Sequence, residues 1–157
     1  MSLEIERKFL VKNDAFKKES YQTTYIKQGF LNSNKERVVR VRIAGDKAYL
    51  TIKGKSNNTG TTRFEWEKEI SVLEAKELFN LCEPGIIEKN RFLIKNESHT
   101  FEVDEFLEDN KGLIIAEIEL SKENEKFKIP FWLGKEVTGD EKYYNSNISK
   151  LPFKNWI

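Results

Sequence analysis

Three charged side chains alternate with other residues in the run Glu4-Ile5-Glu6-Arg7-Lys8. If the run is a β-strand, alternate residues share one face, so two carboxylates and one ammonium group line about 13 Å of that face. Two close carboxylates suit a hard divalent cation, and a nearby ammonium suits the phosphate that such a cation carries. A solvated edge strand explains the same run, because charged residues also protect sheet edges. The rest of the chain must decide between the two interpretations.

Most of the remaining chain also alternates with a period of two residues. This pattern predicts eight strands, at about residues 2–11, 21–31, 36–44, 47–54, 61–70, 86–95, 99–106 and 112–121. Short connections such as Gly45-Asp46 favour antiparallel pairing. A capping-box pattern at Ser71 and Glu74 predicts a helix to about residue 82, and residues 13–20 and 141–150 fit two shorter helices.

Nearly every predicted strand has one apolar and one charged face, and the charges recur in same-sign groups. The basic set is Lys8, Arg40, Arg42, Lys53, Arg63, Lys89 and Arg91. The acidic set is Glu4, Glu6, Glu65, Glu67, Asp104, Glu117 and Glu119. Same-sign neighbours on one face repel unless something lies between them, as a bound polyanion and its metal ions would. Two architectures fit, an ordinary sheet with its charged face in water or a closed barrel with a charged interior and helices outside.

The two charged sets together suit phosphoryl or nucleotidyl transfer. Arginine and lysine bind phosphate oxygens, while carboxylates are hard ligands for Mg²⁺ or Mn²⁺. A P-loop is excluded, because Tyr49 stands where its first glycine is required and a polar loop, not a helix, follows Gly54-Lys55-Ser56.

Composition narrows the class of protein further. The 157 residues fit a single domain, and 27 basic residues nearly balance 26 acidic ones, so a nucleic-acid surface is not indicated. Cys82 is the only cysteine and is expected in the core, whereas His99 is the only histidine and is expected in a loop. The sequence shows neither a signal peptide nor a membrane span, which predicts a cytoplasmic protein.

The opening run resembles the E-x-E-x-K signature of the CYTH domains, also called triphosphate tunnel metalloenzymes. Further segments follow in the family's order: Gln28-Gly29-Phe30-Leu31, Arg40-Val41-Arg42, Thr51-Ile52-Lys53, Arg63-Phe64-Glu65-Trp66-Glu67, Lys89-Asn90-Arg91, Asp104-Glu105-Phe106, Gly112-Leu113, Ala116-Glu117-Ile118-Glu119-Leu120 and Trp132-Leu133-Gly134-Lys135-Glu136-Val137-Thr138-Gly139-Asp140. The resemblance covers nearly the whole chain, 1–157. Within the family, the chain is similar to the small bacterial single-domain branch.

The resemblance implies a mainly β fold, an eight-stranded antiparallel closed barrel that binds a triphosphate together with Mg²⁺ or Mn²⁺. It implies that the basic set, Lys8, Arg40, Arg42, Lys53, Arg63, Lys89 and Arg91, holds the phosphates, with Arg63 the weakest match. Glu4, Glu6, Asp104, Glu117 and Glu119 are implied metal ligands, with the first two meeting the last two across the tunnel. The resemblance also implies that four residues take part in the chemistry: Lys8, Glu65, Glu67 and Lys89.

One residue departs from the family pattern. Phe30 stands where many relatives have a tyrosine, and it has no hydroxyl for proton transfer. A water molecule activated by metal is therefore favoured as the nucleophile.

The expected activity is hydrolysis of inorganic tripolyphosphate. An adenylate cyclase, a thiamine or nucleoside triphosphatase, and a non-catalytic polyphosphate-binding module remain alternatives. Trp132 and Trp156, both expected at the surface, suggest a homodimer.

Overall fold

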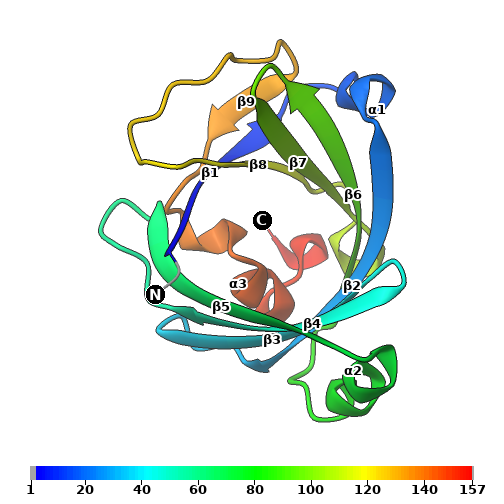
Figure 1. Cartoon of the computed structure of the whole chain (residues 1–157). Helices are drawn as coiled ribbons and strands as arrows, with labels where there is room; N and C mark the ends of the chain where they lie inside the picture. The colour runs from blue at the N-terminus through cyan, green and yellow to red at the C-terminus, as the bar shows by residue number, and fades with distance from the viewer. Residues whose placement is uncertain (1–2, 157) are drawn as a thin grey trace.

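The computed structural model describes residues 3–156 and is built mainly from β-strands (Figure 1). The strands are β1 (Leu3–Val11), β2 (Gln22–Asn32), β3 (Arg37–Ala44), β4 (Lys47–Gly54), β5 (Thr62–Ile70), β6 (Ile87–Asn96), β7 (His99–Phe106), β8 (Ile114–Glu119) and β9 (Leu133–Glu136). The helices are α1 (Phe16–Glu19), α2 (Val72–Phe79) and α3 (Asn145–Lys150), with 3₁₀ turns at Glu108–Asn110, Glu141–Tyr143 and Phe153–Asn155. The eight predicted strands are confirmed; β9 was not predicted.

The strands form one antiparallel sheet in the order β5-β4-β3-β2-β6-β7-β8-β1-β9. Strand β1 also pairs with β5, with Glu4 opposite Arg63, so the first eight strands close into a barrel. Closure removes the free sheet edges and confirms the barrel over the open sheet. Strand β9 adds to β1 outside this ring, where Arg7 binds the carboxylate of Glu136 at 2.7 and 2.8 Å.

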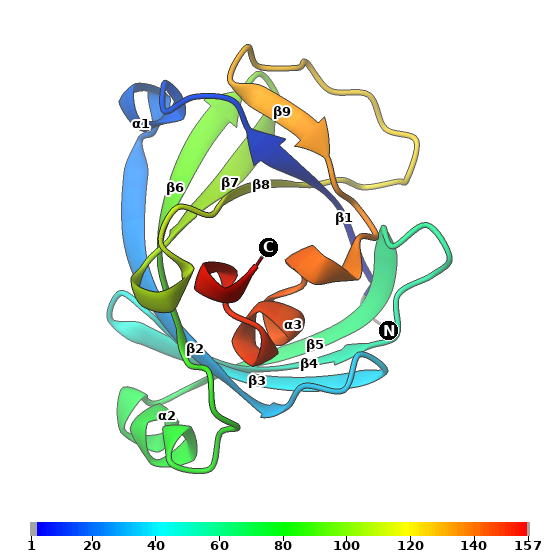
Figure 2. The same ribbon diagram turned by 180° about the vertical axis from the view of Figure 1, so that it is seen from behind.

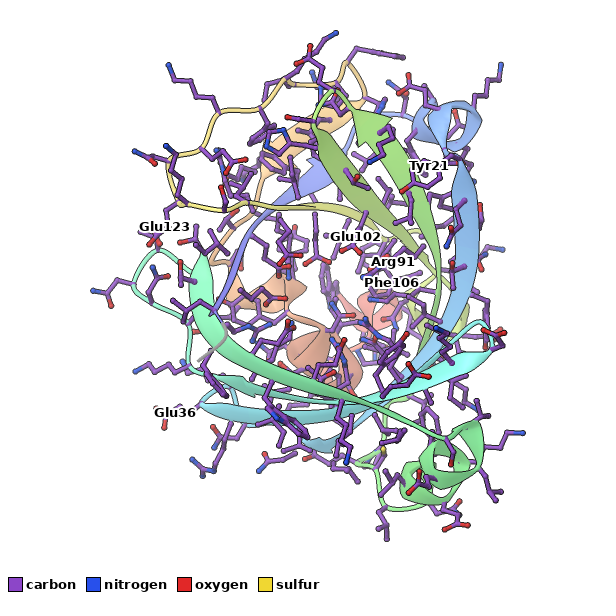
Figure 3. All side chains as sticks on the ribbon, viewed as in Figure 1. Tyr21, Glu36, Arg91, Glu102, Phe106 and Glu123 are labelled. Carbon is purple, nitrogen blue, oxygen red and sulfur yellow. The ribbon has the colours of Figure 1, made fainter. Side chains whose placement is uncertain are left out.

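The barrel is apolar outside and charged inside, as the alternation of the strands requires. The largest core cluster includes Phe9, Phe101, Val103, Ile118 and Trp132, and it lies between the outer face of β1, β7 and β8 and the covering segments. In Figure 3, Arg91 and Glu102 lie inside the ring of strands, whereas Glu36 and Glu123 lie outside it. The apolar side chains of this cluster are buried on the outer face of the barrel, under the covering segments. The interior of the barrel is therefore available for charged groups.

The helices take different places around the barrel. Helix α2 packs outside β3 and β4 through Ala75, and its predicted capping box forms between Ser71 and Glu74. Helix α3 and the C-terminal turn lie across one end of the barrel, as seen from that end in Figure 2. There Ile148 packs with Phe30 and Phe106. This end is closed by apolar packing, so the opposite end is the mouth (Figure 1).

Several smaller expectations change. Trp132 is fully buried, so it gives no support to a homodimer; the exposed large aromatic residues include Trp66 and Phe64 on β5. His99 is the first residue of β7 and contacts Glu125 at 2.5 Å; it does not lie in a loop. No helix among residues 3–156 is long and apolar enough to cross a membrane.

Gly85 fixes the position of α3 and provides a test of that closure. Its φ is +100°, and a Cβ there would lie 1.9 Å from the backbone oxygen of Ser149. We expect Gly85→Ala to lower the free energy of unfolding by about 3 kcal/mol or more, because both the backbone and α3 must shift. Gly45 is the matched control: its φ is +61°, but a Cβ there would meet nothing closer than 3.7 Å. Thermal unfolding of Gly45→Ala should show a loss of about 1 kcal/mol, and equal losses for the two variants would contradict the packing described.

Candidate active site

A charged cavity of about 220 Å³ lies inside the barrel. Every predicted site residue except Asp104 lines it: Glu4, Glu6, Lys8, Arg40, Arg42, Lys53, Arg63, Glu65, Glu67, Lys89, Arg91, Glu117 and Glu119. These residues come from six strands, and only barrel closure brings them together. Phe30 also lines the cavity, but it is 2% exposed and supplies no hydroxyl.

Arg40 has the clearest unmet bonding capacity in the cavity. Its side chain is 10% exposed, and one terminal nitrogen lies 3.2 Å from Thr51 Oγ1 and 3.6 Å from Glu67 Oε2. Its Nε is the one buried side-chain nitrogen or oxygen without a hydrogen-bond partner among residues 3–156. An unsatisfied buried donor is costly, so this atom indicates the place of an absent acceptor.

Asp104 lies behind the cavity wall, where it holds two cations in place. Its carboxylate accepts two hydrogen bonds from Arg91 at 2.8 and 2.9 Å and lies 2.7 Å from Lys89 Nζ. Burial opposes ionisation, but Arg91 and Lys89 hold the pKa of Asp104 well below its usual range. Burial also lowers the pKa of Lys89 to about 7, against the opposing effect of Asp104. Both carboxylate oxygens are engaged, so the structure does not place Asp104 with the expected metal ligands.

The remaining acidic residues lie on neighbouring strands. In the β1–β8 pair, Glu6 is opposite Glu119 and Lys8 is opposite Glu117, so the expectation that these carboxylates meet across the tunnel is wrong. Burial and the carboxylates of Glu117 and Glu4 raise the pKa of Glu6 well above its usual range. Glu117 behaves differently. Burial alone would raise its pKa, but Lys8, a hydrogen bond with Glu6 and the charge of Arg91 together outweigh burial and lower the pKa to about 2. The negative charge around Glu6 is thus not fully neutralised by neighbouring cations.

These carboxylates offer the oxygen donors that Mg²⁺ and Mn²⁺ prefer. In the part of the chain that the structure describes, no three His, Cys, Asp or Glu side chains are already arranged to hold a metal ion. The orientation of Glu4 explains part of this, because its oxygens lie 3.0 and 3.1 Å from Lys53 Nζ. Lys53 also lies 3.4 Å from Glu65. The donor set fits a hard cation, provided that Glu4 turns away from Lys53.

Four lining residues with polar side chains were not predicted as part of the site. Glu102 lies on the charged face of β7 and contacts Arg91 at 3.3 Å, so the alternation that identified Asp104 could have found it. Tyr144, Asn145 and Ser146 come from the C-terminal segment. Lys8 Nζ lies 5.2 Å from the centre of the Tyr144 ring. No periodic pattern indicates that this short helix reaches a cavity inside the barrel.

The family follows from comparison of the whole chain. A sequence profile described as the CYTH domain matches residues 2–152. The chain belongs to the CYTH domain family. Over 157 residues, this CYTH chain is 52% identical to an inorganic triphosphatase of Acetivibrio thermocellus, with 99% of each chain covered. It is 31% identical to an inorganic triphosphatase of Nitrosomonas europaea, covering 93% of this chain and 96% of that one.

Solved structures agree with the CYTH assignment. The crystal structure of the inorganic triphosphatase NE1496 has a TM-score of 0.66 and 29% identity, with 95% of each chain covered. A Hippeastrum protein described as a putative adenylyl cyclase with a dominant triphosphatase activity has a TM-score of 0.58 at 15% identity, covering 78% of this chain and 80% of that one. At that identity, the second likeness concerns the CYTH fold alone.

Proposed function

We propose that this CYTH domain hydrolyses inorganic tripolyphosphate to pyrophosphate and orthophosphate in a reaction that depends on Mg²⁺ or Mn²⁺. The single observation that carries the proposal is the buried, unpartnered Nε of Arg40 within a cavity lined by further cations. A phosphate oxygen would satisfy that nitrogen, since guanidinium groups pair well with phosphate. Full-length similarity to two inorganic triphosphatases supports the same substrate class.

The phosphate chain would be held by the basic residues of the wall. Taken as whole residues, Lys53, Lys89 and Arg40 are each less than 10% exposed, so water screens their charges weakly. Arg42, Arg63, Arg91 and Lys8 complete the binding set. In the proposed reaction a water oxygen bonds to a terminal phosphorus, the bond from that phosphorus to its bridging oxygen breaks, and Glu65 or Glu67 accepts a proton from the water.

We assign four carboxylates to the divalent cation: Glu4, Glu6, Glu117 and Glu119. Asp104 is instead assigned as a positioning residue for Lys89 and Arg91. A bound Mg²⁺ or Mn²⁺ ion would neutralise phosphate oxygens and lower the pKa of water.

A cyclase would in addition require a site for a nucleobase. Within residues 3–156 the cavity wall carries only two aromatic side chains, Phe30 and Tyr144, and the second lies against Lys8. This composition favours the inorganic substrate.

The proposal predicts that Lys8→Ala and Glu6→Ala each reduce phosphate release from tripolyphosphate by about 100-fold or more. Lys8 would supply positive charge to the reacting phosphate, and Glu6 would help to hold the divalent cation that neutralises it. The assay follows phosphate after treatment of the protein with a chelator and addition of Mg²⁺ or Mn²⁺. Lys35→Ala is the matched control, because Lys35 is an exposed lysine paired with Glu141 outside the cavity. Unchanged rates in the two cavity variants would refute the site assignment.

A homodimer and a cytoplasmic location remain predictions.

A further inference from the structure

Asn145 carries a chain of hydrogen bonds from α3 into the phosphate-binding part of the cavity. Its Oδ1 accepts hydrogen bonds from Lys89 Nζ at 2.9 Å and from Gln28 Nε2 at 2.8 Å. Gln28 is fully buried, and its Oε1 accepts from Arg42 Nε at 2.8 Å. The C-terminal segment is thereby connected to two of the proposed phosphate ligands, Lys89 and Arg42.

The chemistry of the partners fixes how both amides are oriented. Lysine and arginine only donate, so the oxygen of Asn145 must face Lys89 and the oxygen of Gln28 must face Arg42. The Nδ2 group of Asn145 is then left to donate elsewhere, and it makes no hydrogen bond within residues 3–156. Since Asn145 lines the cavity, this amide lies beside Lys89 with an unused donor.

We propose that Asn145 is a substrate-binding residue whose Nδ2 donates a hydrogen bond to a phosphate oxygen of the bound triphosphate. The inference rests on the proposed function for the identity of its ligand. Lys89 and Arg42 attract the anion, whereas the amide adds a neutral donor of fixed direction. Helix α3 therefore contributes one wall of the phosphate site in addition to closing the end of the barrel.

Asn145→Asp separates this role from a purely structural one. The aspartate has nearly the same shape, and its carboxylate can still accept from Lys89 and Gln28, so the docking of α3 is retained. The other oxygen, however, presents negative charge where the amide donated to phosphate. We expect Asn145→Asp to weaken tripolyphosphate binding by about 10-fold or more, and Asn145→Ala, which loses the donor without adding charge, to weaken it less.

The readout is calorimetric titration of tripolyphosphate into the metal-free protein, which requires no turnover. Asn147→Asp is the matched control, because Asn147 lies on the same helix and donates to Glu141 O away from the cavity. The control should bind within about twofold of the wild type. Thermal unfolding of all variants checks that the fold is retained.

Each outcome decides the inference. Binding by Asn145→Asp as tight as that of the wild type, with Asn145→Ala weaker, would show a structural role and overturn it. A wild-type protein that binds tripolyphosphate without hydrolysing it would refute the proposed function while leaving the role of Asn145 intact if Asn145→Asp binds weakly. Absence of wild-type binding would refute both.

Discussion

Asp104→Asn is expected to destabilise the folded protein by about 3–5 kcal/mol at neutral pH, because the buried Lys89 loses the carboxylate 2.7 Å from its Nζ. Arg91 keeps only its longer contacts, with Glu102 at 3.3 Å and Glu117 at 3.8 Å. Lys89 is only 1% exposed, so water compensates little for the lost carboxylate. At this chain length the loss corresponds to a fall in melting temperature of about 6–20 °C. Phosphate release should fall as well, since both cations lose the group that orients them.

The pH dependence of this difference has a definite sign. The folded-state pKa of Asp104 lies below the ordinary value of 3.8, so its contribution is fully present above about pH 4 and is lost as the pH falls below that value. The stability gap between wild type and Asp104→Asn should therefore narrow in acid. Glu102→Gln is the control: that side chain is 41% exposed and contacts the same arginine, so its loss should cost less than about 1 kcal/mol. Equal losses in urea-unfolding experiments would contradict the positioning role of Asp104.

Glu6→Gln is expected to stabilise the metal-free protein while it reduces phosphate release by about 100-fold or more. In the folded protein the pKa of Glu6 is raised by burial and by the carboxylates of Glu117 and Glu4. The folded state therefore becomes less stable as the pH rises above the ordinary value of 4.5 and Glu6 must ionise among other acids. Removing that charge should add about 1 kcal/mol, or about 2–4 °C in melting temperature.

Thermal unfolding in the presence of a chelator at pH 5 and pH 8 measures this effect. The gain from Glu6→Gln should be larger at pH 8, where the wild-type carboxyl is more fully ionised. Glu36→Gln, an exposed substitution outside the barrel (Figure 3), should change the free energy of unfolding by less than about 0.5 kcal/mol. A Glu6→Gln protein less stable than the wild type at pH 8 would show that the carboxylate cluster is not under charge repulsion.

The strands were predictable because each carries a simple periodic signal. Alternation placed Arg40 and Arg42 on the face opposite Val41, and the structure has them in that arrangement. Barrel closure was different, because an open sheet has the same alternation. It was inferred only with the help of the family resemblance, and the β1–β5 pairing depends on contacts between residues about 60 positions apart.

The site was predictable as a set of residues but only partly as an arrangement. Asp104 has the same strand pattern as Glu102, yet it lies deeper and is neutralised by Lys89 and Arg91. A sequence pattern identifies the face of a strand but says little about depth along the tunnel. Asn145 was missed because a helix of six residues carries no periodic signal for a position inside a barrel. Its role appears only through the hydrogen bonds to Lys89 and Gln28.

One product analysis tests whether the charged tunnel hydrolyses a triphosphate with a divalent metal ion. Tripolyphosphate, ATP and thiamine triphosphate are each supplied with Mg²⁺ or Mn²⁺, and orthophosphate, pyrophosphate and cyclic AMP are separated and quantified. The proposed function predicts metal-dependent release of orthophosphate and pyrophosphate, fastest from tripolyphosphate. Cyclic AMP as the main product from ATP, or no release of phosphate from any of the three substrates, would contradict it.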